Sequence, residues 1–239
     1  MSSDDRIASD SGARGEPLSE LAYQKLREDI LRADVPPDSK LKIEVLQQRY
    51  SLSNTPLREA LNRLVAERLV VADERRGFRV MPVSLRQFVD LTEFRYVVEE
   101  GALLNAITHG GDDWEAGVVA AFHRLEAVEK RVTLSESSSD DEWRIRHKAL
   151  HMALLLGCTS QRLVSTCAAV FDEAERYRCF AAKLARSERH AGDEHRRIME
   201  AALERDARLA TALMRNHVKR TADHVAEMLH ELRAVPARG

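Results

Sequence analysis

From Ser84 to about Arg233 the sequence is a succession of long helix-forming stretches with few interruptions. Only 10 glycines and 6 prolines occur in the whole chain, so turn-forming residues are scarce. The breaks in this region are Gly110-Gly111, a serine-rich stretch at 135–139, Gly157 and Gly192. The pattern predicts a bundle of about six helices. Their expected ranges are roughly 84–108, 112–132, 140–157, 160–185, 187–205 and 207–232.

The composition restricts the kind of partner that the chain can have. Its net charge is −2, so any nucleic-acid site must be a local basic patch. No apolar run approaches the about 18 residues of a membrane span, and the polar, acidic N-terminus does not resemble a signal peptide. The three cysteines match no zinc finger in their spacing, which favours reduced thiols. We therefore expect a cytoplasmic protein without a membrane partner.

The chain divides into three parts. Residues 1–16 show no apolar period and are expected to form a disordered tail. Residues 17–82 combine short helices with a strand-like end, and residues 83–233 are helical throughout. The predicted fold class is therefore mainly α, with the domain junction near Met81-Pro82.

The first domain has the pattern of a winged helix-turn-helix. An amphipathic helix is predicted over 18–33 and a second helix over 43–50, followed by a short turn at 51–53. Thr55 is expected to cap a third helix with Pro56 at its first position. Two short helices joined by a tight turn can place the second one in a major groove of DNA. The apolar face of the third helix consists of Leu57, Leu61, Leu64 and Val65.

A β-hairpin follows the third helix. Strand-like segments at 69–72 and 78–81 flank a turn in which Gly77 permits a conformation that a side chain would oppose. Residues 40–79 contain nine lysines and arginines against five acidic residues, in a chain that is otherwise slightly acidic. A basic wing of this kind can contact phosphates or the minor groove. The alternative is that these arginines form a solvated helix face without a role at DNA. The arginines near the tip of the wing are Arg75, Arg76 and Arg79.

The stretch LKIEVLQQRYSLSNTPLREALNRLVAERLVVADERRGFRV resembles the DNA-binding module of the GntR superfamily of bacterial transcription factors. The positions that match the pattern of this family are Thr55, Pro56, Arg58, Glu59, Ala60, Leu61 and Gly77. Asn54 departs from it, because the family usually has an arginine there that often contacts bases, so the operator sequence is not carried over. The DNA-binding residues that the resemblance and the wing imply are Asn54, Thr55, Arg58, Asn62, Arg63, Arg75, Arg76 and Gly77.

Four histidines of the second domain form a candidate metal site. His147 and His151 are four residues apart, hence on one helical face. His195 and His217 lie on the last two helices, and the break near Asp206 folds these helices back on each other. Neutral imidazoles suit zinc, nickel or copper. Single histidines are more often ordinary surface or core residues, so the spacing alone leaves both interpretations open.

Residues 84–232 look like the FCD ligand-binding domain of the FadR branch of the same superfamily. The positions that match it are Arg95, Glu99, Leu150, His151, Ser160, Leu163, Glu194, His195, Arg196, Ile198, Ala201, Asp206, Ala210, Met214 and His217. In many such domains an aspartate and three histidines bind a divalent metal. The resemblance puts His151, His195 and His217 at the histidine positions and His147 at the aspartate position. It implies a zinc or nickel site whose charge is about +2 when four neutral imidazoles bind the ion.

The resemblance also implies a small organic acid as effector. A carboxylate can bind the metal while an arginine holds a second carboxylate through paired hydrogen bonds. The stretches GGDDWEA, HKALHMALLLGC and FDEAERYR are most similar to carbon-starvation regulators of the CsiR type, which suggests glutarate or a related dicarboxylate. An ion pair with Glu99 is the alternative role for Arg95, and solvated surface is the alternative for Arg176 and Arg178. The candidate effector-binding residues are Arg95, Arg146, Arg176, Tyr177 and Arg178.

These features favour a ligand-controlled transcription factor, and a repressor in particular. A homodimer would place two basic modules on a pseudo-palindromic operator in double-stranded DNA. A metal-dependent enzyme on a helical bundle is the main alternative, but the sequence has no nucleophile motif or phosphate-binding glycine loop, and an enzyme leaves the winged module unexplained. A helical adaptor without a role at DNA also leaves that module unexplained.

Overall fold

The computed structural model describes residues 17–73, 77–134, 140–185 and 192–234. The chain forms two compact units, one made of Met1–Glu28 and Lys40–Arg79, the other of Asp29–Ser39 and Val80–Gly239. Helices dominate both, and the described strands form one small sheet, which confirms the predicted mainly α class. Within the described residues no helix is long and apolar enough to cross a membrane.

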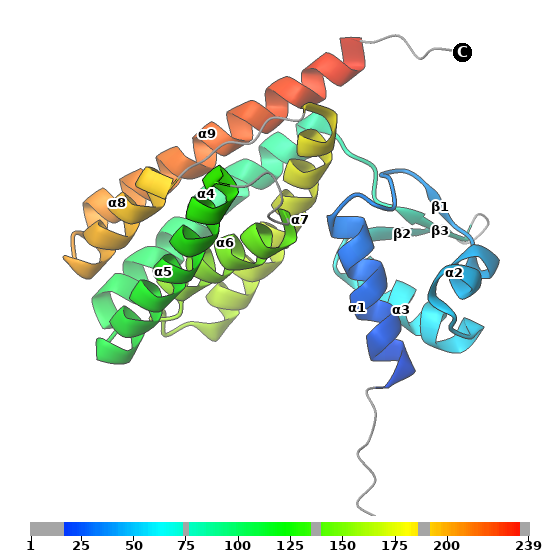
Figure 1. The fold of residues 1–239 in the computed structure, drawn as a ribbon, viewed down its shortest axis with the longest axis horizontal. Helices are drawn as coiled ribbons and strands as arrows, with labels where there is room; N and C mark the ends of the chain where they lie inside the picture. Colours follow the sequence, from blue (N-terminus) through cyan, green and yellow to red (C-terminus); the bar gives the residue numbers. More distant parts are fainter. Residues whose placement is uncertain (1–16, 74–76, 135–139, 186–191, 235–239) are drawn as a thin grey trace, which may run out of the picture. The chain divides into compact units, whose positions relative to one another are not determined.

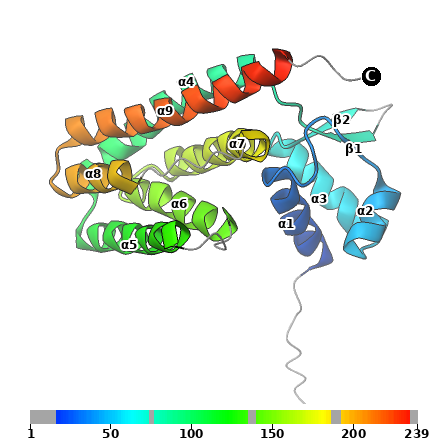
Figure 2. The same ribbon diagram turned by 45° about the horizontal axis from the view of Figure 1, so that its top comes forward.

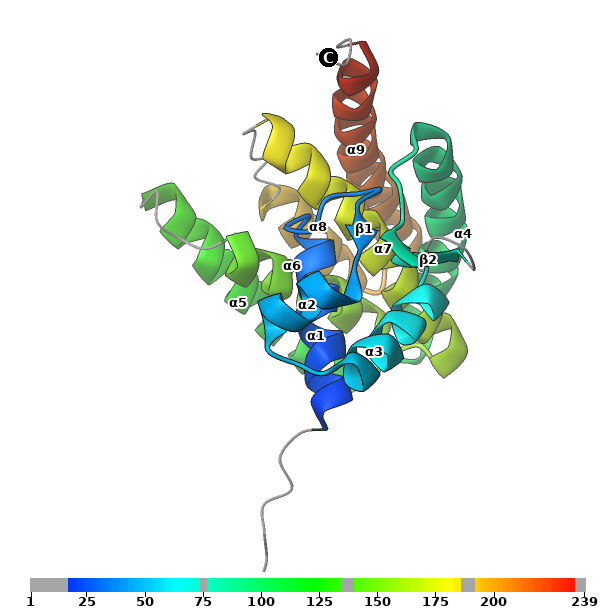
Figure 3. The same cartoon turned by 90° about the vertical axis from the view of Figure 1, so that its right-hand side faces the viewer.

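The N-terminal module is a winged helix-turn-helix (Figure 3). The helices are α1 (Leu18–Leu31), α2 (Ile43–Tyr50) and α3 (Asn54–Ala66). The strands are β1 (Lys40–Leu41), β2 (Val70–Asp73) and β3 (Gly77–Val80). They form a sheet in the order β1-β3-β2, in which Lys40 lies opposite Arg79 in an antiparallel pair. The sequence predicted the β2–β3 hairpin but not the short strand β1.

Burial of one apolar face explains the position of α3. Leu57, Leu61 and Leu64 follow the four-then-three spacing of one helical face, and each is fully buried. Leu26 of α1 and Leu46 of α2 are buried as well. The chain turns between α2 and α3 at Ser51, whose φ of 56° is left-handed. The polar face of α3 is consequently exposed.

The predicted start of α3 was wrong by two residues, because Pro56 was expected at the first helical position. The helix begins at Asn54, and Ser53 rather than Thr55 is the residue that precedes it. Pro56 therefore lies at the third helical position. It is tolerated there because no backbone N–H in the first turn has an acceptor within the helix.

The C-terminal part is a helical bundle, as the sequence predicted (Figure 1). Ser84 caps the first helix, because its hydroxyl oxygen accepts a hydrogen bond from the backbone N–H of Gln87 at 3.4 Å. The described helices are α4 (Leu85–His109), α5 (Asp112–Leu134), α6 (Asp140–Leu155), α7 (Gln161–Ala185), α8 (Gly192–Leu203) and α9 (Ala207–Ala234).

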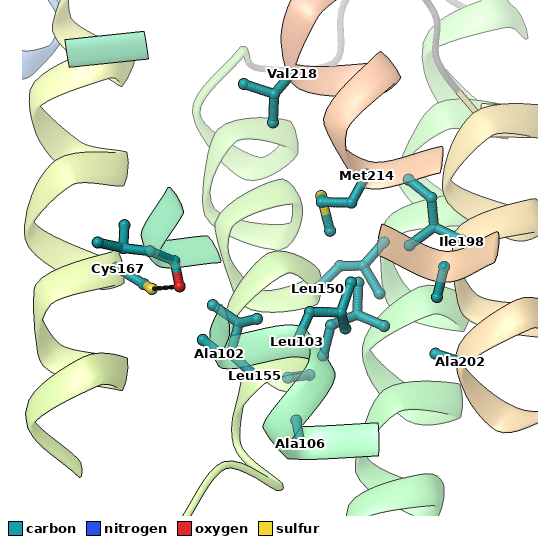
Figure 4. Packing of buried hydrophobic residues seen from close by; sticks show 14 of the residues in the cluster. Ala102, Leu103, Ala106, Leu150, Leu155, Cys167, Ile198, Ala202, Met214 and Val218 are labelled. Atoms are coloured by element: carbon teal, nitrogen blue, oxygen red, sulfur yellow. Dashed lines mark hydrogen bonds between the residues drawn. The ribbon is translucent and has the colours of Figure 1, made fainter. Parts of the chain in front are cut away.

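The helices pack in a way that surrounds one apolar core. α4 lies along α9 and also packs on α7, α5 packs on α6 and α8, and α8 returns on α9 (Figure 2). Figure 4 shows Leu103, Leu150, Ile198 and Met214, which come from α4, α6, α8 and α9 and meet in the buried cluster. Three of these helices, α6, α8 and α9, also supply the histidines described below.

Two of the glycines that interrupt the helical pattern permit close packing. A Cβ atom on Gly157 would lie 2.8 Å from the carbonyl oxygen of Ala106 and 3.0 Å from the Cα of Gly110. A Cβ atom on Gly110 would lie 2.4 Å from the ring of Trp114. The ends of α4 and α6 therefore approach each other where a side chain would not fit.

Candidate functional site

The exposed face of α3 presents polar side chains in the N-terminal module. Asn54, Thr55, Arg58 and Asn62 are exposed, as expected of residues that contact DNA. The Nε–H of Arg58 donates a hydrogen bond to Oδ1 of Asn54 at 2.8 Å. This bond aligns the two side chains along the first turns of the helix.

A shallow hollow of about 330 Å³ lies beside this face. Its lining includes Lys40, Lys42, Asn54, Arg58 and Gly77. The lining has three cationic side chains against one carboxylate, that of Glu44, and the N-terminus of α3 adds the partial positive charge of its backbone N–H groups. The hollow is therefore suited to an anion such as a backbone phosphate. Gly77 has a φ of 78°, which explains why glycine occupies this turn.

Arg63 makes different contacts from those expected of a DNA-binding residue. Its Nη1–H donates to Oε2 of Glu20 at 2.7 Å, and its guanidinium lies 3.7 Å from the centre of the Tyr23 ring. The side chain thus joins α3 to α1. Arg75 and Arg76 lie outside the described residues.

The four histidines selected from the sequence come together in the helical domain. His147 and His151 project from α6, His195 from α8 and His217 from α9. One nitrogen of each ring lies within 4.8 Å of one nitrogen of every other ring. All four side chains are buried, with exposed fractions of 1–6%. We call this group the imidazole cluster.

The convergence of His195 and His217 follows from their positions in a helical hairpin. Each lies eleven residues from Asp206, on either side of the turn between α8 and α9. Eleven residues are about three helical turns, so both side chains return to the same face at the same height. Arg205 makes the turn with a φ of 60°, and Oδ1 of Asp206 accepts a hydrogen bond from the N–H of Leu209 at 2.9 Å to begin α9. The ring centres of the two histidines are 4.7 Å apart.

A chain of polar contacts leads from the cluster to the surface. The Nδ1–H of His217 donates a hydrogen bond to Oε2 of Glu194 at 3.0 Å. The Nη1–H of Arg220 donates to the other carboxylate oxygen of Glu194 at 2.7 Å. A second carboxylate approaches the cluster from α5, where Oε1 of Glu129 lies 3.7 Å from Nδ1 of His195.

Burial keeps the α6 pair of histidines neutral. Desolvation, and next the other imidazoles, hold the pKa of His147 and that of His151 well below the ordinary value of 6.5. The indole of Trp143 stacks on the ring of His147 at a centre-to-centre distance of 4.4 Å and an angle of 15°. Phe171 covers both rings from α7, with ring centres 5.6 Å and 5.2 Å from those of His147 and His151.

The donor set fits a divalent metal ion. Within the described part of the chain, Nδ1 of His147 and both ring nitrogens of His195 are buried and form no hydrogen bond. Buried polar atoms without partners are rare in folded proteins, and an ion among them would supply the missing interaction. Neutral imidazole nitrogens are ligands of zinc, nickel and copper rather than of magnesium or calcium. The residues that would hold the ion are His147, His151, His195 and His217.

Arg95 lies near the cluster but is already paired. Its Nε–H donates to Oε1 of Glu99 at 2.7 Å, and both side chains are largely buried. The guanidinium also lies 5.5 Å from the centre of the Phe171 ring, whose nearest imidazole neighbour is His151. The expected ion pair is therefore present, and it leaves other donors of Arg95 close to the cluster.

Arg178 and Arg146 occupy different surroundings. Arg178 lies 4.8 Å from the centre of the Trp143 ring, which stacks on the imidazole of His147. Its Nε–H donates to Glu175 at 2.8 Å. Arg146 is 40% exposed and only 3.9 Å from Glu142 on its own helix.

Arg176 and Tyr177 contact the segment that begins α4. The Nη1–H of Arg176 donates to the carbonyl oxygen of Met81, and the Tyr177 ring is 4.9 Å from that of Phe88. Burial lowers the pKa of Arg176 and raises that of Tyr177. Their described neighbours are therefore the residues before and within α4, and not the imidazole rings.

Sequence reasoning missed the supporting residues of the cluster. Neither Glu194 nor Glu129 was predicted as a site residue. Glu194 contacts His217 and Glu129 approaches His195, and each contact joins two different helices, which the spacing of residues in the sequence does not reveal. Glu194 precedes His195, and neighbours in a helix point about 100° apart, so adjacency gave no signal. Trp143, four residues before His147, has the spacing of a same-face neighbour.

Two family models match the chain. The model described as bacterial regulatory proteins of the gntR family matches residues 18–80, and that of the FCD domain matches residues 90–220. The first range contains the winged helix-turn-helix, and the second contains all four histidines.

Relatives match most of the chain. The HTH-type transcriptional repressor GlaR of Escherichia coli K12 is 39% identical over 202 residues, which cover 82% of this chain and 90% of GlaR. The HTH-type transcriptional regulator BphR of Paraburkholderia xenovorans LB400 is 36% identical and covers 84% of this chain and 82% of BphR.

Solved structures share the fold. McbR/YncC of E. coli superposes with a TM-score of 0.73 at 17% identity, covering 90% of this chain and 100% of the other. A GntR transcriptional regulator from Rhodococcus sp. RHA1 superposes with a TM-score of 0.66 at 20% identity, covering 89% and 97%.

Proposed function

We propose a metal-containing, carboxylate-controlled repressor as the function of this chain, which belongs to the gntR family of bacterial regulatory proteins and has an FCD domain. The chain is a DNA-binding transcriptional regulator and not an enzyme, as its family models and relatives indicate. The metal, the effector and the direction of control are the parts that we propose. Repression is supported by the similarity to a repressor that covers four-fifths of the chain.

We assign DNA binding to residues 17–82. The exposed face of α3 supplies Asn54, Thr55, Arg58 and Asn62, and the hollow beside it suits a backbone phosphate. Without the family's usual arginine, Asn54 can pair with adenine or contact a phosphate. A homodimer would present two such faces to the half-sites of a pseudo-palindromic operator. Binding to a bacterial operator requires a cytoplasmic location.

We assign metal binding to the imidazole cluster and effector binding and dimerisation to residues 83–233. The observation that carries this assignment is the convergence of His147, His151, His195 and His217 within 4.8 Å in the interior of the bundle. When bound, zinc or nickel would act as a Lewis acid toward an anionic ligand. Four neutral imidazoles do not cancel the charge of a divalent ion, so an anionic effector would complement it.

The effector that fits this charge is a small dicarboxylate, such as glutarate. One carboxylate would complement the ion, and the other would meet a guanidinium at the edge of the cluster. Arg95 and Arg178 are the closest candidates, because each lies within 6 Å of an aromatic ring that contacts His147 or His151. Arg146, Arg176 and Tyr177 have other neighbours and are weaker candidates.

Control of DNA binding requires that the effector prefer one arrangement of the protein. A ligand shifts an equilibrium only by its difference in affinity for the two states. We propose that glutarate favours the arrangement that cannot place both winged modules on one operator. If the repressed genes encode enzymes that break down the effector, binding of the effector should release the repressor from DNA.

A selection experiment followed by titration tests this function. Duplexes that the protein retains from a random DNA pool should share two inverted half-sites. Glutarate should then weaken binding to the selected duplex at fixed salt, and removal of the metal with a chelator should abolish this response. The proposal is wrong if neither glutarate nor any other C3–C6 carboxylic acid changes DNA affinity.

A further inference from the structure

Glu194 connects a buried histidine of the cluster to an exposed arginine. Its carboxylate accepts one hydrogen bond from Nδ1–H of His217 and another from Arg220. The exposed side-chain fraction rises along this series of contacts, from 5% for His217 to 21% for Glu194 and 64% for Arg220. Because α8 provides Glu194 and α9 provides both of its partners, these two hydrogen bonds also hold the two helices together.

This contact determines which nitrogen of His217 faces the cluster. An ionised carboxylate only accepts hydrogen bonds, so the proton of a neutral His217 resides on Nδ1. Its Nε2 then carries the lone pair. Carboxylates that fix imidazoles in this way orient them for a metal and make them better donors.

Neither His147 nor His195 has an equivalent carboxylate hydrogen bond within the described residues. Among the described residues, Nδ1 of His147 is buried and has no hydrogen-bond partner. The ring is held instead by stacking on Trp143, and its Nε2 lies 3.1 Å from that of His151. Stacking fixes the plane of a ring but not the position of its proton.

Two carboxylates near the cluster bear on the charge of a bound ion. A divalent ion among four neutral imidazoles would place two positive charges in a buried site. Glu194 contacts His217, and Oε1 of Glu129 lies 3.7 Å from Nδ1 of His195. Oε1 of Glu129 also accepts a hydrogen bond from Nε1–H of Trp143 at 3.3 Å. Both carboxylates would offset the charge of the ion, but of these two described residues only Glu194 is hydrogen-bonded to a histidine of the cluster.

We infer that Glu194 is a positioning residue for metal binding, which makes His217 the best-oriented ligand of the cluster. It presents Nε2 of His217 to the ion, and Arg220 holds the carboxylate in place. This inference rests on the proposed metal site, because it concerns how that site is organised.

Zinc affinity tests the inference through a matched pair of variants. Glu194→Ala should raise the zinc Kd of the full chain by about 10- to 100-fold in a chelator competition. Glu200→Ala removes an exposed glutamate from the same helix and should leave the Kd unchanged. Glu194→Asp, which keeps the charge, should recover part of the affinity. If the wild-type chain binds no zinc, the proposed site is wrong and this inference falls with it.

A purely structural role gives a different result. In that case Glu194→Ala would lower the melting temperature equally with and without zinc, and the zinc Kd would match that of Glu200→Ala. That outcome would overturn the inference and leave the proposed metal site intact.

Long-range 1H–15N spectra of the metal-free chain provide a second test. They should show the Nδ1–H tautomer for His217 in the wild type, and an Nε2–H tautomer would contradict the inference.

Discussion

The Nε2 atoms of His147 and His151 face each other at 3.1 Å in the interior of the helical domain. Burial keeps both rings neutral, so the two nitrogens either share one proton or direct their lone pairs at a common cation. His195 and His217 approach the same place from α8 and α9. A cation satisfies all four rings at once, whereas a single proton satisfies only one pair.

Purified chain should accordingly contain about one zinc or nickel ion, and its removal should lower stability. Zinc at 100 times its Kd adds about 2.7 kcal/mol to the free energy of unfolding, which a thermal-shift experiment detects. His217→Ala should lose more zinc affinity than His147→Ala, because Glu194 orients His217 while Nδ1 of His147 has no described partner.

His230→Ala provides the control for these variants, since His230 is an exposed histidine on α9. It should leave both zinc content and the zinc-dependent rise in melting temperature unchanged. Elemental analysis without metal, together with an unchanged melting temperature on addition of zinc or nickel, would refute the metal site.

Arg58→Ala should weaken operator binding about tenfold without unfolding the chain. The side chain is exposed on α3, lines the hollow beside it, and hydrogen bonds only to Asn54 among the contacts described above. If it contacts a phosphate, its loss should also lower the slope of log affinity against log salt by about one. Fluorescence anisotropy at several salt concentrations measures both quantities.

Arg208→Ala removes an exposed arginine from α9 and serves as the charge control. It should not change DNA affinity at any salt concentration. Equal affinities for Arg58→Ala and the wild type would remove Arg58 from the interface.

Arg63→Ala should affect the stability of the N-terminal module more than its DNA contacts. The guanidinium bonds Glu20 at 2.7 Å and lies over the Tyr23 ring, so it connects α3 to α1. Both side chains of the ion pair are partly exposed, Arg63 by 45% and Glu20 by 34%, so the loss should be small. A double-mutant cycle with Glu20→Ala, followed by chemical denaturation, should show that the two effects are coupled. Additive losses would mean that Arg63 acts independently of Glu20.

Periodicity predicted the elements of this fold because each helix buries one regular face. The spacing of Leu57, Leu61 and Leu64 located α3, and the break near Asp206 indicated that α8 and α9 form a hairpin. The boundary of α3 was less predictable, because a proline fits several positions of a first turn. The two-residue strand β1 has too few residues to show alternation.

The imidazole cluster could be anticipated from spacing, but its supporting contacts could not. His147 and His151 share a face through their local separation. The bond from His217 to Glu194 instead spans 23 residues and depends on how two helices are rotated against each other. Arg63 illustrates the same limit, because its distance of 43 residues from Glu20 hides the ion pair from any local pattern.

The thiols of Cys167 and Cys179 should react slowly at ordinary pH. Burial disfavours the charged thiolate and raises the pKa of Cys167, and likewise that of Cys179, to about 12. At pH 8 only about one such thiol in ten thousand is ionised, and the reactive fraction grows about tenfold with each pH unit. Alkylation followed by mass spectrometry should therefore show a rate that rises steadily from pH 8 to 10 without a plateau. Denaturant should make all three cysteines react rapidly, and fast labelling of native Cys167 would contradict its burial.

The response to a dicarboxylate should depend on both the ion and an arginine. Glutarate should raise the melting temperature of the zinc-bound chain, because a ligand that binds only the folded state stabilises it, and a chelator should reduce the effect. Arg178→Ala should weaken this response about tenfold if its guanidinium, 4.8 Å from the Trp143 ring, binds the second carboxylate. Butyrate, which lacks that carboxylate, should bind the wild type and Arg178→Ala equally. Isothermal titration with both acids tests the assignment, and an equal loss of butyrate binding would mean that Arg178 supports the structure of the site.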